Sequence, residues 1–359
     1  MIGILTFFDY INYGTYLQAY ALQNYLLQKG YENEFIYYRN RENSSNEYAT
    51  VLERDSKGDP VTYGRILKKI AVFKSYHKLL RKTKRYYTRE ELSALNYDVI
   101  ILGSDQIWCY TKEWTGVDTP FFSDYLNAKK IISYAASMGP DKCDQQHPRI
   151  VKRLMQNFTH LGVRDTNTFN FAQALNQNPP VMVLDPTQLY DFSRECREVS
   201  LRDYILFYSD GLVPPPEVVA ELKRIARENN LKIVSIGMKF DWCDRSIITP
   251  SPFRFMGYVK NARFVVTCMY HGLMFTVKFK RQFAMFLIPE RENKCLDFLN
   301  QIGLANRVIR DAGMVQSLYD TPIDYTPVDN YLEEQKKISE DFLLKALENH
   351  QGARDAKEH

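Results

Sequence analysis

Short apolar runs alternate with longer amphipathic stretches along most of this chain. The short runs are typical of strands buried on both faces of a parallel sheet, and the stretches between them have the period of surface helices. The chain begins with one such unit: residues 2–7 predict a strand, 15–30 an amphipathic helix ending at Gly30, and 33–38 a second strand. Because a helix joins the two strands, we expect them to be parallel members of one sheet.

The alternation continues in two series of predicted strands, one on either side of a polar segment. The first series comprises 97–103, 129–137, 160–165 and 180–186, and the second comprises 204–209, 231–237, 262–268 and 281–287. Residues 194–202 between them carry no clear period, so we place the domain boundary there.

We therefore expect two domains of the α/β class. The N-terminal domain covers 1–193, the C-terminal domain covers 203–330, and residues 331–359 add a helix and a polar tail. Each domain is predicted to contain a Rossmann-like parallel sheet, and open sheets of this kind bind ligands beyond the carboxyl ends of their strands. The two sheets would face each other across a cleft, and candidate chemistry is expected in the loops that follow the strands.

The composition is that of a globular protein. Of the 359 residues, 45% are hydrophobic and 25% are charged, which excludes a disordered or fibrous chain. No apolar run approaches the roughly 18 residues of a membrane span, and no apolar leader follows Met1, so we expect a cytoplasmic protein. The six cysteines lack the close pairs of a metal knuckle, which predicts reduced thiols and no metal site.

Basic residues are concentrated in one segment. Residues 65–89 include ten Lys or Arg and no acidic residue, although the net charge of the whole chain is only +4. Two interpretations are open: a solvated helical face, or a basic amphipathic surface that contacts an anionic membrane. Nucleic acid is not expected as a partner, because no nucleic-acid-binding motif accompanies the segment.

Polar residues follow two of the predicted strands of the N-terminal domain. Near Asn12 and Gly14 a helix begins, and its N–H groups could hold an anion, although an ordinary cap by Asn12 is the plainer alternative. Side chains after strand 97–103 could bind sugar hydroxyls, although an Asx turn also explains Ser104 and Asp105. The candidate residues of these two loops are Asn12, Tyr13, Gly14, Ser104, Asp105 and Gln106.

Two further candidates carry charge or can carry a proton. Arg164 ends the strand 160–165, which predicts either an ion pair with Asp165 or another neighbour, or an anion in the cleft. His271 follows the strand 262–268 and starts a helix with Gly272. A histidine at such a turn is often only a structural hydrogen-bonding residue. Because four other strand-end loops converge on the same cleft, we favour a functional role for His271.

Six motifs occur in the order and spacing of a known family: INYGTYLQAYALQ, GSDQIW, SYAASMG, VRD, VLDPT and SPFRFMGYVKNARFVVTCMYHG. In these motifs the chain resembles the polysaccharide pyruvyl transferase family, and the later ENKCLDFLNQIGLANRVI looks like its closing segment. The resemblance covers about residues 1–310. It implies a GT-B-like fold and a transfer of pyruvate from phosphoenolpyruvate to a sugar of a cell-surface polysaccharide or its lipid-linked precursor, usually as a ketal.

The same resemblance implies roles for individual residues. By the resemblance His271 matches a position that contacts the donor, and the chemistry of the reaction suits it as the catalytic acid that protonates the vinyl CH₂ group. Guanidinium groups bind carboxylate and phosphate in a two-point geometry, which suits the donor contacts implied for the arginines. The resemblance implies Arg164 and Arg291 as donor-binding residues, and we add Tyr270 and Gly272 beside His271 as further candidates. The six residues of the N-terminal domain would then lie on the acceptor side, and no metal or organic cofactor is expected.

Two other interpretations of the function remain open. A nucleotide-sugar glycosyltransferase has the same GT-B architecture and would bind a nucleotide diphosphate sugar in place of phosphoenolpyruvate. A non-catalytic homologue would bind an anion or a glycan without turnover, because a fold alone does not establish an activity.

Overall fold

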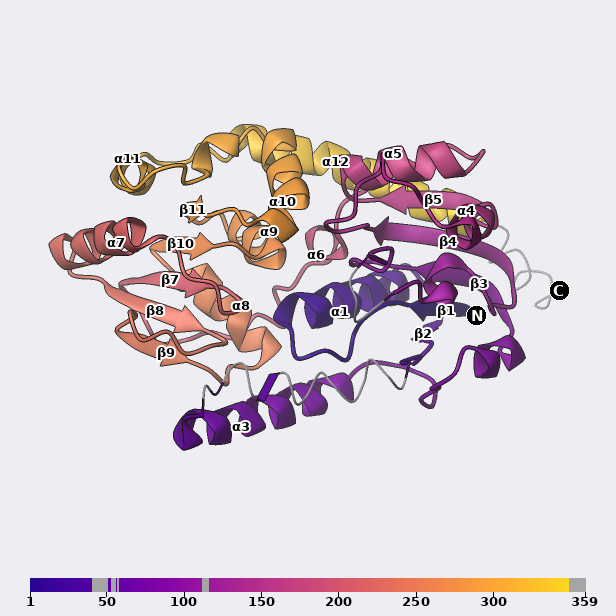
Figure 1. Cartoon of the computed structure of the whole chain (residues 1–359), viewed down its shortest axis with the longest axis horizontal. Coiled ribbons are helices and arrows are strands. Elements are labelled where there is room, and N and C mark those ends of the chain that lie inside the picture. Colours follow the sequence, from indigo (N-terminus) through magenta and orange to yellow (C-terminus); the bar gives the residue numbers. More distant parts are fainter. Residues whose placement is uncertain (41–50, 53–55, 57, 112–115, 349–359) are drawn as a thin grey trace.

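Two parallel sheets, each covered by helices, lie side by side in the computed structural model (Figure 1). The structure describes residues 1–40, 51–52, 56, 58–111 and 116–348. The predicted fold class is therefore confirmed: the chain forms two α/β domains of the GT-B type, each built on an open sheet.

The first sheet contains six strands in the order β2-β1-β3-β4-β5-β6, and each neighbouring pair is parallel. Its strands are β1 (Ile2–Leu5), β2 (Asn33–Phe35), β3 (Tyr97–Leu102), β4 (Ala128–Ala136), β5 (His160–Val163) and β6 (Val181–Met182). The helices of this part are α1 (Tyr13–Gln28), α3 (Pro60–His77), α4 (Arg149–Met155), α5 (Thr166–Leu175) and α6 (Pro186–Leu189), with the short 3₁₀ helices η1 (Glu90–Ala94) and η2 (Thr119–Phe122). Strands β1 and β3 are almost wholly buried, which explains their continuous apolar sequences.

The second sheet contains five parallel strands in the order β11-β10-β7-β8-β9. Its strands are β7 (Tyr204–Tyr208), β8 (Lys232–Ile236), β9 (Arg245–Ile247), β10 (Phe264–Thr267) and β11 (Phe283–Met285). Its helices are α7 (Pro216–Glu228), α8 (Pro252–Asn261), α9 (Tyr270–Lys278), α10 (Pro289–Gln301), η3 (Ala305–Arg307) and α11 (Met314–Asp320).

The last helix, α12 (Thr326–Leu347), returns from the second sheet to the first (Figure 1). The hydroxyl of Ser339 on α12 accepts a hydrogen bond from the Leu184 N–H at 2.9 Å, and Lys130 of β4 donates to Glu348 O at 2.9 Å. A helix was expected from residue 331, and it begins one turn and a half earlier because Pro327 occupies its first turn.

Contacts across the domain interface shape the space between the sheets. The Lys69 ammonium of α3 donates to Gly237 O at 2.9 Å, and Tyr13 of α1 stacks on Phe255 of α8 with ring centroids 4.6 Å apart. Helix α1 also contacts α9, and one continuous cluster of buried apolar residues includes members of both domains. In the part of the chain that the structure describes, no helix has both the length and the apolar character needed to cross a bilayer.

Candidate active site

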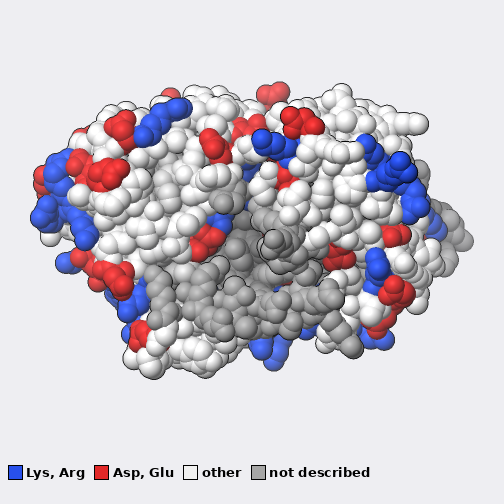
Figure 2. Space-filling model, viewed as in Figure 1, with Lys and Arg blue, Asp and Glu red and all other residues white. Residues whose placement is uncertain are grey.

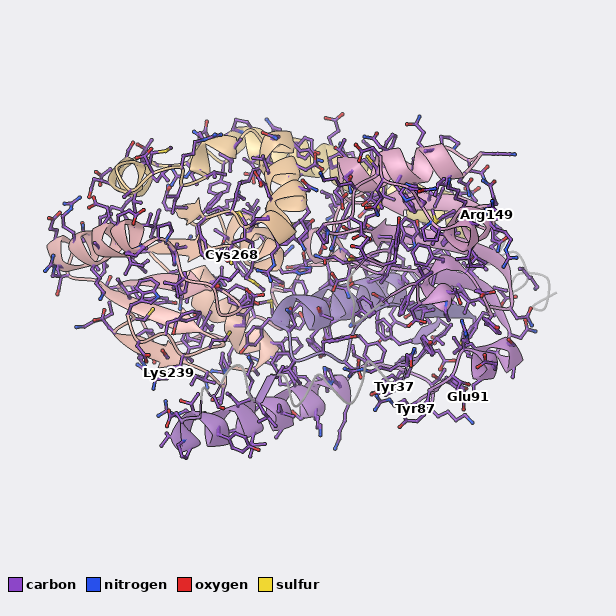
Figure 3. All side chains as sticks on the ribbon, in the orientation of Figure 1. Tyr37, Tyr87, Glu91, Arg149, Lys239 and Cys268 are labelled. Carbon is purple, nitrogen blue, oxygen red and sulfur yellow. The ribbon has the colours of Figure 1, made fainter. Side chains whose placement is uncertain are left out.

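A cleft of about 470 Å³ lies between the domains, where the strands of both sheets end. Helices α1, α9 and α10 begin at this cleft, and the positive ends of their dipoles favour an anion there. Cys268, labelled in Figure 3, marks the end of β10 beside the cleft. The polar residues that line the cleft are Tyr10, Asn12, Thr15, Asp105, Gln106, Tyr208, Asp210, Tyr270, His271, Arg291 and Lys294.

The imidazole of His271 lies between the two domains. It belongs to the first turn of α9, directly after β10, and its side chain is 10% exposed. The ring packs on Gly14 of α1 so closely that a Cβ atom at that glycine would lie 2.1 Å from Nδ1. Gly14 therefore has a packing reason to be glycine, because any larger residue would displace the His271 ring.

A buried carboxylate lies on the other side of the His271 ring. His271 Nε2 is 3.3 Å from Asp185 Oδ2, which is within ion-pair distance, although the two groups are not aligned as a hydrogen bond. Asp185 also caps α6 by accepting from the Thr187 N–H at 3.0 Å. Burial alone would raise the pKa of Asp185, but the charges of His271 and Arg164 outweigh burial and hold that pKa well below its usual value. Asp185 is therefore an ionised partner for the imidazole.

Arg164 lies in the wall behind the cleft lining, with a side chain that is 1% exposed. Its Nη1 donates to Asp185 Oδ2 at 2.7 Å and to Ser104 Oγ at 3.2 Å, and its Nη2 donates to Asp105 Oδ1 at 3.3 Å. Its guanidinium carbon is 4.6 Å from the centre of the Tyr270 ring. Of the two interpretations of Arg164, the structure shows an ion pair with neighbours, although Asp165 is not the partner; a direct contact with a ligand stays a prediction.

Asp105 joins this wall to the cleft surface. Its Oδ2 accepts a hydrogen bond from Thr15 Oγ1 at 3.0 Å, and its Oδ1 accepts from the Gln106 N–H at 2.8 Å. Burial tends to raise the pKa of Asp105, but Arg164 and His271 outweigh it, so that the pKa lies below its usual value. Asp105 therefore presents an ionised carboxylate to the cleft.

Two cationic side chains reach the cleft from α10. Arg291 donates from Nη1 to Asp210 Oδ1 at 3.0 Å and also contacts the second oxygen of that carboxylate. Lys294, one turn further, is 6% exposed and lines the cleft, with Nζ 5.6 Å from the centre of the Tyr270 ring. No hydrogen bond or ion pair of Lys294 is present among the residues that the structure describes. It is a buried cation with room for an anionic partner.

Burial lowers the pKa of Lys294 to about 8. The neighbouring Cys295 opposes this shift, the charges of Arg164 and Arg291 add to it, and Asp105 opposes it. An ammonium group in such surroundings gains from a nearby anion more than an exposed lysine would, because the interaction is poorly screened by water.

Comparison with known families identifies the chain. A family model described as polysaccharide pyruvyl transferase matches residues 12–288, which is most of the sequence. The chain belongs to the polysaccharide pyruvyl transferase family. The matched range contains both Asn12 at the start of α1 and His271 at the start of α9, so it includes strand-end loops from both sheets.

Solved structures are similar to this pyruvyl transferase family member at low sequence identity. The S. aureus MnaA structure with UDP has a TM-score of 0.51 and 11% identity, and the match covers 96% of this chain and 95% of that one. The E. coli heptosyltransferase WaaC with ADP has a TM-score of 0.41 and 13% identity, with coverage of 93% and 100%. At 11% identity the likeness to the MnaA structure concerns the fold alone. A search of curated proteins finds no match.

Several residues predicted for the site of this pyruvyl transferase family member lie in its walls. Tyr13 is 2% exposed and donates its hydroxyl to Pro250 O at 3.1 Å, so it belongs to the domain interface. Ser104 is fully buried beside Arg164, and Gly272 is packed so tightly that a Cβ atom there would lie 2.5 Å from Thr267 Oγ1. These three do not line the cleft.

The first turn of α1 is closed by its own cap. Asn12 Oδ1 accepts from the N–H groups of Gly14 and Thr15 at 2.8 and 3.1 Å, which is the plainer of the two alternatives predicted for this loop. Asn12 and Gln106 still line the cleft beside Asp105.

Six residues of the site were not predicted from the sequence: Tyr10, Thr15, Asp185, Tyr208, Asp210 and Lys294. The motif VLDPT contained a signal for Asp185, since a carboxylate after a strand and before a proline is a typical helix cap near a ligand. Lys294 had no such signal, because it lies within a helix in which several polar residues, such as Glu292 and Asn293, are solvent-exposed. Among the residues that the structure describes, no cluster of three or more metal-binding side chains occurs.

Proposed function

We propose that this protein transfers pyruvate from phosphoenolpyruvate to two hydroxyl groups of one sugar, which forms a cyclic ketal and releases phosphate. The acceptor would be a sugar of a cell-surface polysaccharide or of its lipid-linked precursor at the inner face of the cytoplasmic membrane. Family membership supports the transfer to a polysaccharide. The observation that carries the proposal is the presence of His271, Arg291 and Lys294 in one cleft between the domains.

The donor would bind on the C-terminal side of the cleft. Lys294 is buried and can pair with the phosphate or the carboxylate of phosphoenolpyruvate. Arg291 has five N–H donors, so its pairing with Asp210 leaves others for the donor. These cations and the N-termini of α9 and α10, which have no side-chain cap, would balance the charge of the donor, and we infer that the reaction uses neither a metal nor an organic cofactor.

The chemistry would begin with a proton. His271 would protonate the vinyl CH₂ of phosphoenolpyruvate, and the electrophilic C2 would then be attacked by the first sugar hydroxyl, whose own proton passes to a base. Asp105, ionised and exposed to the cleft, is the candidate for that base. The second hydroxyl of the same sugar would then displace phosphate from C2 and complete the ketal. The proton of this hydroxyl would leave on the departing phosphate.

Asp185 would act through His271. Its carboxylate oxygen, 3.3 Å from Nε2, can fix the orientation of the ring and balance the positive charge of the imidazolium. General acid catalysis of this kind typically contributes about 10²- to 10⁴-fold in rate. Arg164 in turn holds Asp185 and Asp105 in place. Its contribution to catalysis would therefore be to position these two carboxylates.

The decisive experiment measures phosphate release from phosphoenolpyruvate with a panel of lipid-linked acceptors carrying galactose, glucose or mannosamine. We expect phosphate release that depends on one of these acceptors, and a product that carries a pyruvyl ketal by mass spectrometry and NMR. Binding of phosphoenolpyruvate without turnover on any acceptor would favour a non-catalytic homologue. Turnover of a nucleotide diphosphate sugar in the same panel would favour the glycosyltransferase alternative.

A further inference from the structure

Helix α3 has an outer face that no other described element covers. Its inner face is buried and includes Ile66, Ile70 and Phe73. On the outer side, the exposed fractions are 62% for Val61 and 46% for Leu67. Singly exposed apolar side chains are normal, but a contiguous exposed apolar patch marks a site for a partner or a membrane.

The exposed apolar residues are interspersed with basic ones. We call the following set the α3 surface: Val61, Tyr63, Arg65, Leu67, Lys68, Lys78 and Leu79, all exposed. Leu79, just beyond the end of the helix, is 58% exposed. Among the described residues, no carboxylate forms an ion pair with Arg65, Lys68 or Lys78. White atoms with a group of blue ones lie along the lower left and middle edge of Figure 2, where Figure 1 places α3.

Small residues complete this face. Gly64, Ala71 and Ser75 lie on the same side of the helix and are exposed, and a Cβ atom added at Gly64 would meet nothing within 4 Å. Small side chains leave the longer leucine and lysine side chains free to project from the surface. This pattern is that of a helix that lies along an interface with its leucines in the acyl boundary and its lysines at the headgroups.

We propose that the α3 surface docks on the anionic face of a lipid bilayer. The mixture of charge and apolar area selects this occupant. A purely electrostatic partner such as nucleic acid would not favour exposed Leu67 and Leu79, and a purely apolar partner would not favour Lys68 and Lys78. The proposal rests on the proposed function in one respect only: membrane binding would serve the enzyme by bringing it to a lipid-linked acceptor.

The surface also has a fixed position relative to the cleft. Helix α3 is tied to the second domain at two points: Lys69, in the middle of the helix, donates to Gly237 O, and the carboxylate of Asp59, at its N-terminal end, lies 3.5 Å from Lys239 Nζ. Lys239, labelled in Figure 3, lies beside that end of the helix. Helix α3 thus contacts both domains, so that docking through it would hold the whole cleft at one distance from the lipid surface.

Vesicle flotation tests the proposal directly, without any assay of activity. The full-length protein is mixed at low salt with vesicles of phosphatidylcholine alone, or of phosphatidylcholine with phosphatidylglycerol. We expect flotation with the anionic vesicles only, and its loss as salt is added. Two double variants are compared: Lys68→Gln with Lys78→Gln, and Leu67→Ser with Leu79→Ser. Each is expected to weaken vesicle binding by roughly tenfold or more, because each basic or apolar side chain contributes separately.

Matched controls come from exposed residues elsewhere. Arg149 on α4 lies far from α3 in Figure 3, and Leu344 on α12 is 42% exposed, so Arg149→Gln and Leu344→Ser should bind vesicles like the unaltered protein. Flotation that is equal with neutral and anionic vesicles, no flotation at low salt, or an equal loss in the control variants would overturn the proposal. Circular dichroism confirms that each variant is folded.

A second arm separates this proposal from the proposed function. Rates are compared for an acceptor embedded in vesicles and for a water-soluble analogue of the same sugar. The Lys68→Gln, Lys78→Gln variant should lose rate with the embedded acceptor and keep it with the soluble one. If the unaltered protein turns over neither acceptor, the proposed function fails while the flotation result stands. If flotation fails but both acceptors react, the docking proposal fails alone.

Discussion

His271 is confined on two sides, by Gly14 of the first domain and by the buried carboxylate of Asp185. If it is the proton donor, His271→Gln should reduce kcat by about 10²-fold or more while the dissociation constant of phosphoenolpyruvate changes little. Glutamine keeps most of the size and a hydrogen-bond donor but cannot deliver a proton. Single-turnover kinetics together with donor titration measure the two effects separately.

A control for this variant is His160→Gln, since His160 lies at the start of β5, away from the cleft. It should leave both constants unchanged. If His271→Gln instead keeps its turnover and loses donor affinity, His271 is a binding residue and the acid must be another group of the cleft.

Lys294 predicts a pH dependence of donor binding. Its pKa is about 8 in the folded protein, so the ammonium form is present below that pH and is lost above it. The phosphate of the donor is fully ionised in this range. Affinity for phosphoenolpyruvate should therefore fall as the pH rises from about 7 to about 9.5, while Lys294→Arg keeps its charge and gives a nearly flat profile. Calorimetric titration at several pH values provides the measurement.

The sign of the stability effect is also fixed. A lysine whose folded pKa is lower than its unfolded value of 10.5 binds fewer protons when folded between about pH 8 and 10.5, so the free energy of unfolding should rise with pH there, relative to Lys294→Met.

A control for the binding profile is Lys278, which has a similar pKa of about 8 and lies outside the cleft lining. If Lys278→Arg, rather than Lys294→Arg, flattens the binding profile, the assignment to Lys294 is wrong.

Residues that follow strands were the ones open to prediction. His271, Asp105 and Gln106 come directly after buried apolar runs, and parallel strands bring their carboxyl ends to one edge, so their approach to a common cleft follows from the sequence. The direction of a side chain does not follow in the same way. Arg164 also ends a strand, yet it turns inward to Asp185, a partner that only the packing of β6 beside β5 brings near.

Helix α1 fits against α9 only because of a glycine. A Cβ atom at Gly14 would lie 2.6 Å or less from Cβ, Cγ and Nδ1 of His271, so the ring as a whole would have to move. Gly14→Ala should therefore lower turnover by about 10²-fold and destabilise the fold by about 1–3 kcal/mol, the usual cost of overpacking. Steady-state kinetics and urea denaturation test the two parts.

Gly64 provides the matched helical control, because a Cβ atom there meets nothing within 4 Å and its φ is not positive. Gly64→Ala should keep activity and raise stability by a few tenths of a kcal/mol to about 1 kcal/mol. A Gly14→Ala variant with unchanged turnover would show that the His271 ring position is not required for catalysis.

Helices and strands with a clear pattern of apolar and polar residues could be predicted from the sequence, and short or polar elements could not. Strands β1, β3, β7 and β10 are mostly apolar, with Asp98 the charged exception in β3, and they appear where the pattern placed them. Strand β9 has three residues, none of them buried, so its sequence carries no alternation to recognise. The basic segment 65–89 is helical only to His77, because the residues after Lys78 pair with the edge of the first sheet through the Phe35–Lys82 and Tyr38–Tyr86 bridges.

At the scale of the whole molecule, the pattern of alternating strands and helices predicts two parallel sheets, which the structure confirms. It does not determine how the sheets face each other. That arrangement depends on side chains distant in sequence, such as Tyr13 stacked on Phe255 and Lys69 bonded to Gly237 O. Periodicity reports which face of an element is buried, but not which element covers it.

Because the cleft is formed by both domains, a ligand that bridges them should stabilise the chain as a unit. At a concentration of 100 times its dissociation constant, phosphoenolpyruvate should add about 2.7 kcal/mol to the free energy of unfolding and raise Tm by a few degrees. The stabilisation by phosphoenolpyruvate should be much smaller in Lys294→Met at the same concentration, because this variant lacks the buried ammonium group. Differential scanning calorimetry gives both values.

The same measurement separates the two enzymatic interpretations. A nucleotide-sugar glycosyltransferase should be stabilised by a nucleotide diphosphate sugar and be indifferent to phosphoenolpyruvate, whereas the cations of α10 and the helix N-termini at this cleft suit a small, highly charged anion. Inorganic phosphate serves as the control for unspecific anion binding. It lacks the carboxylate, so it should stabilise the protein less than phosphoenolpyruvate at equal concentration. Equal shifts for the two would mean that the cleft holds a phosphate group without recognising the pyruvyl part, and the donor assignment would fail.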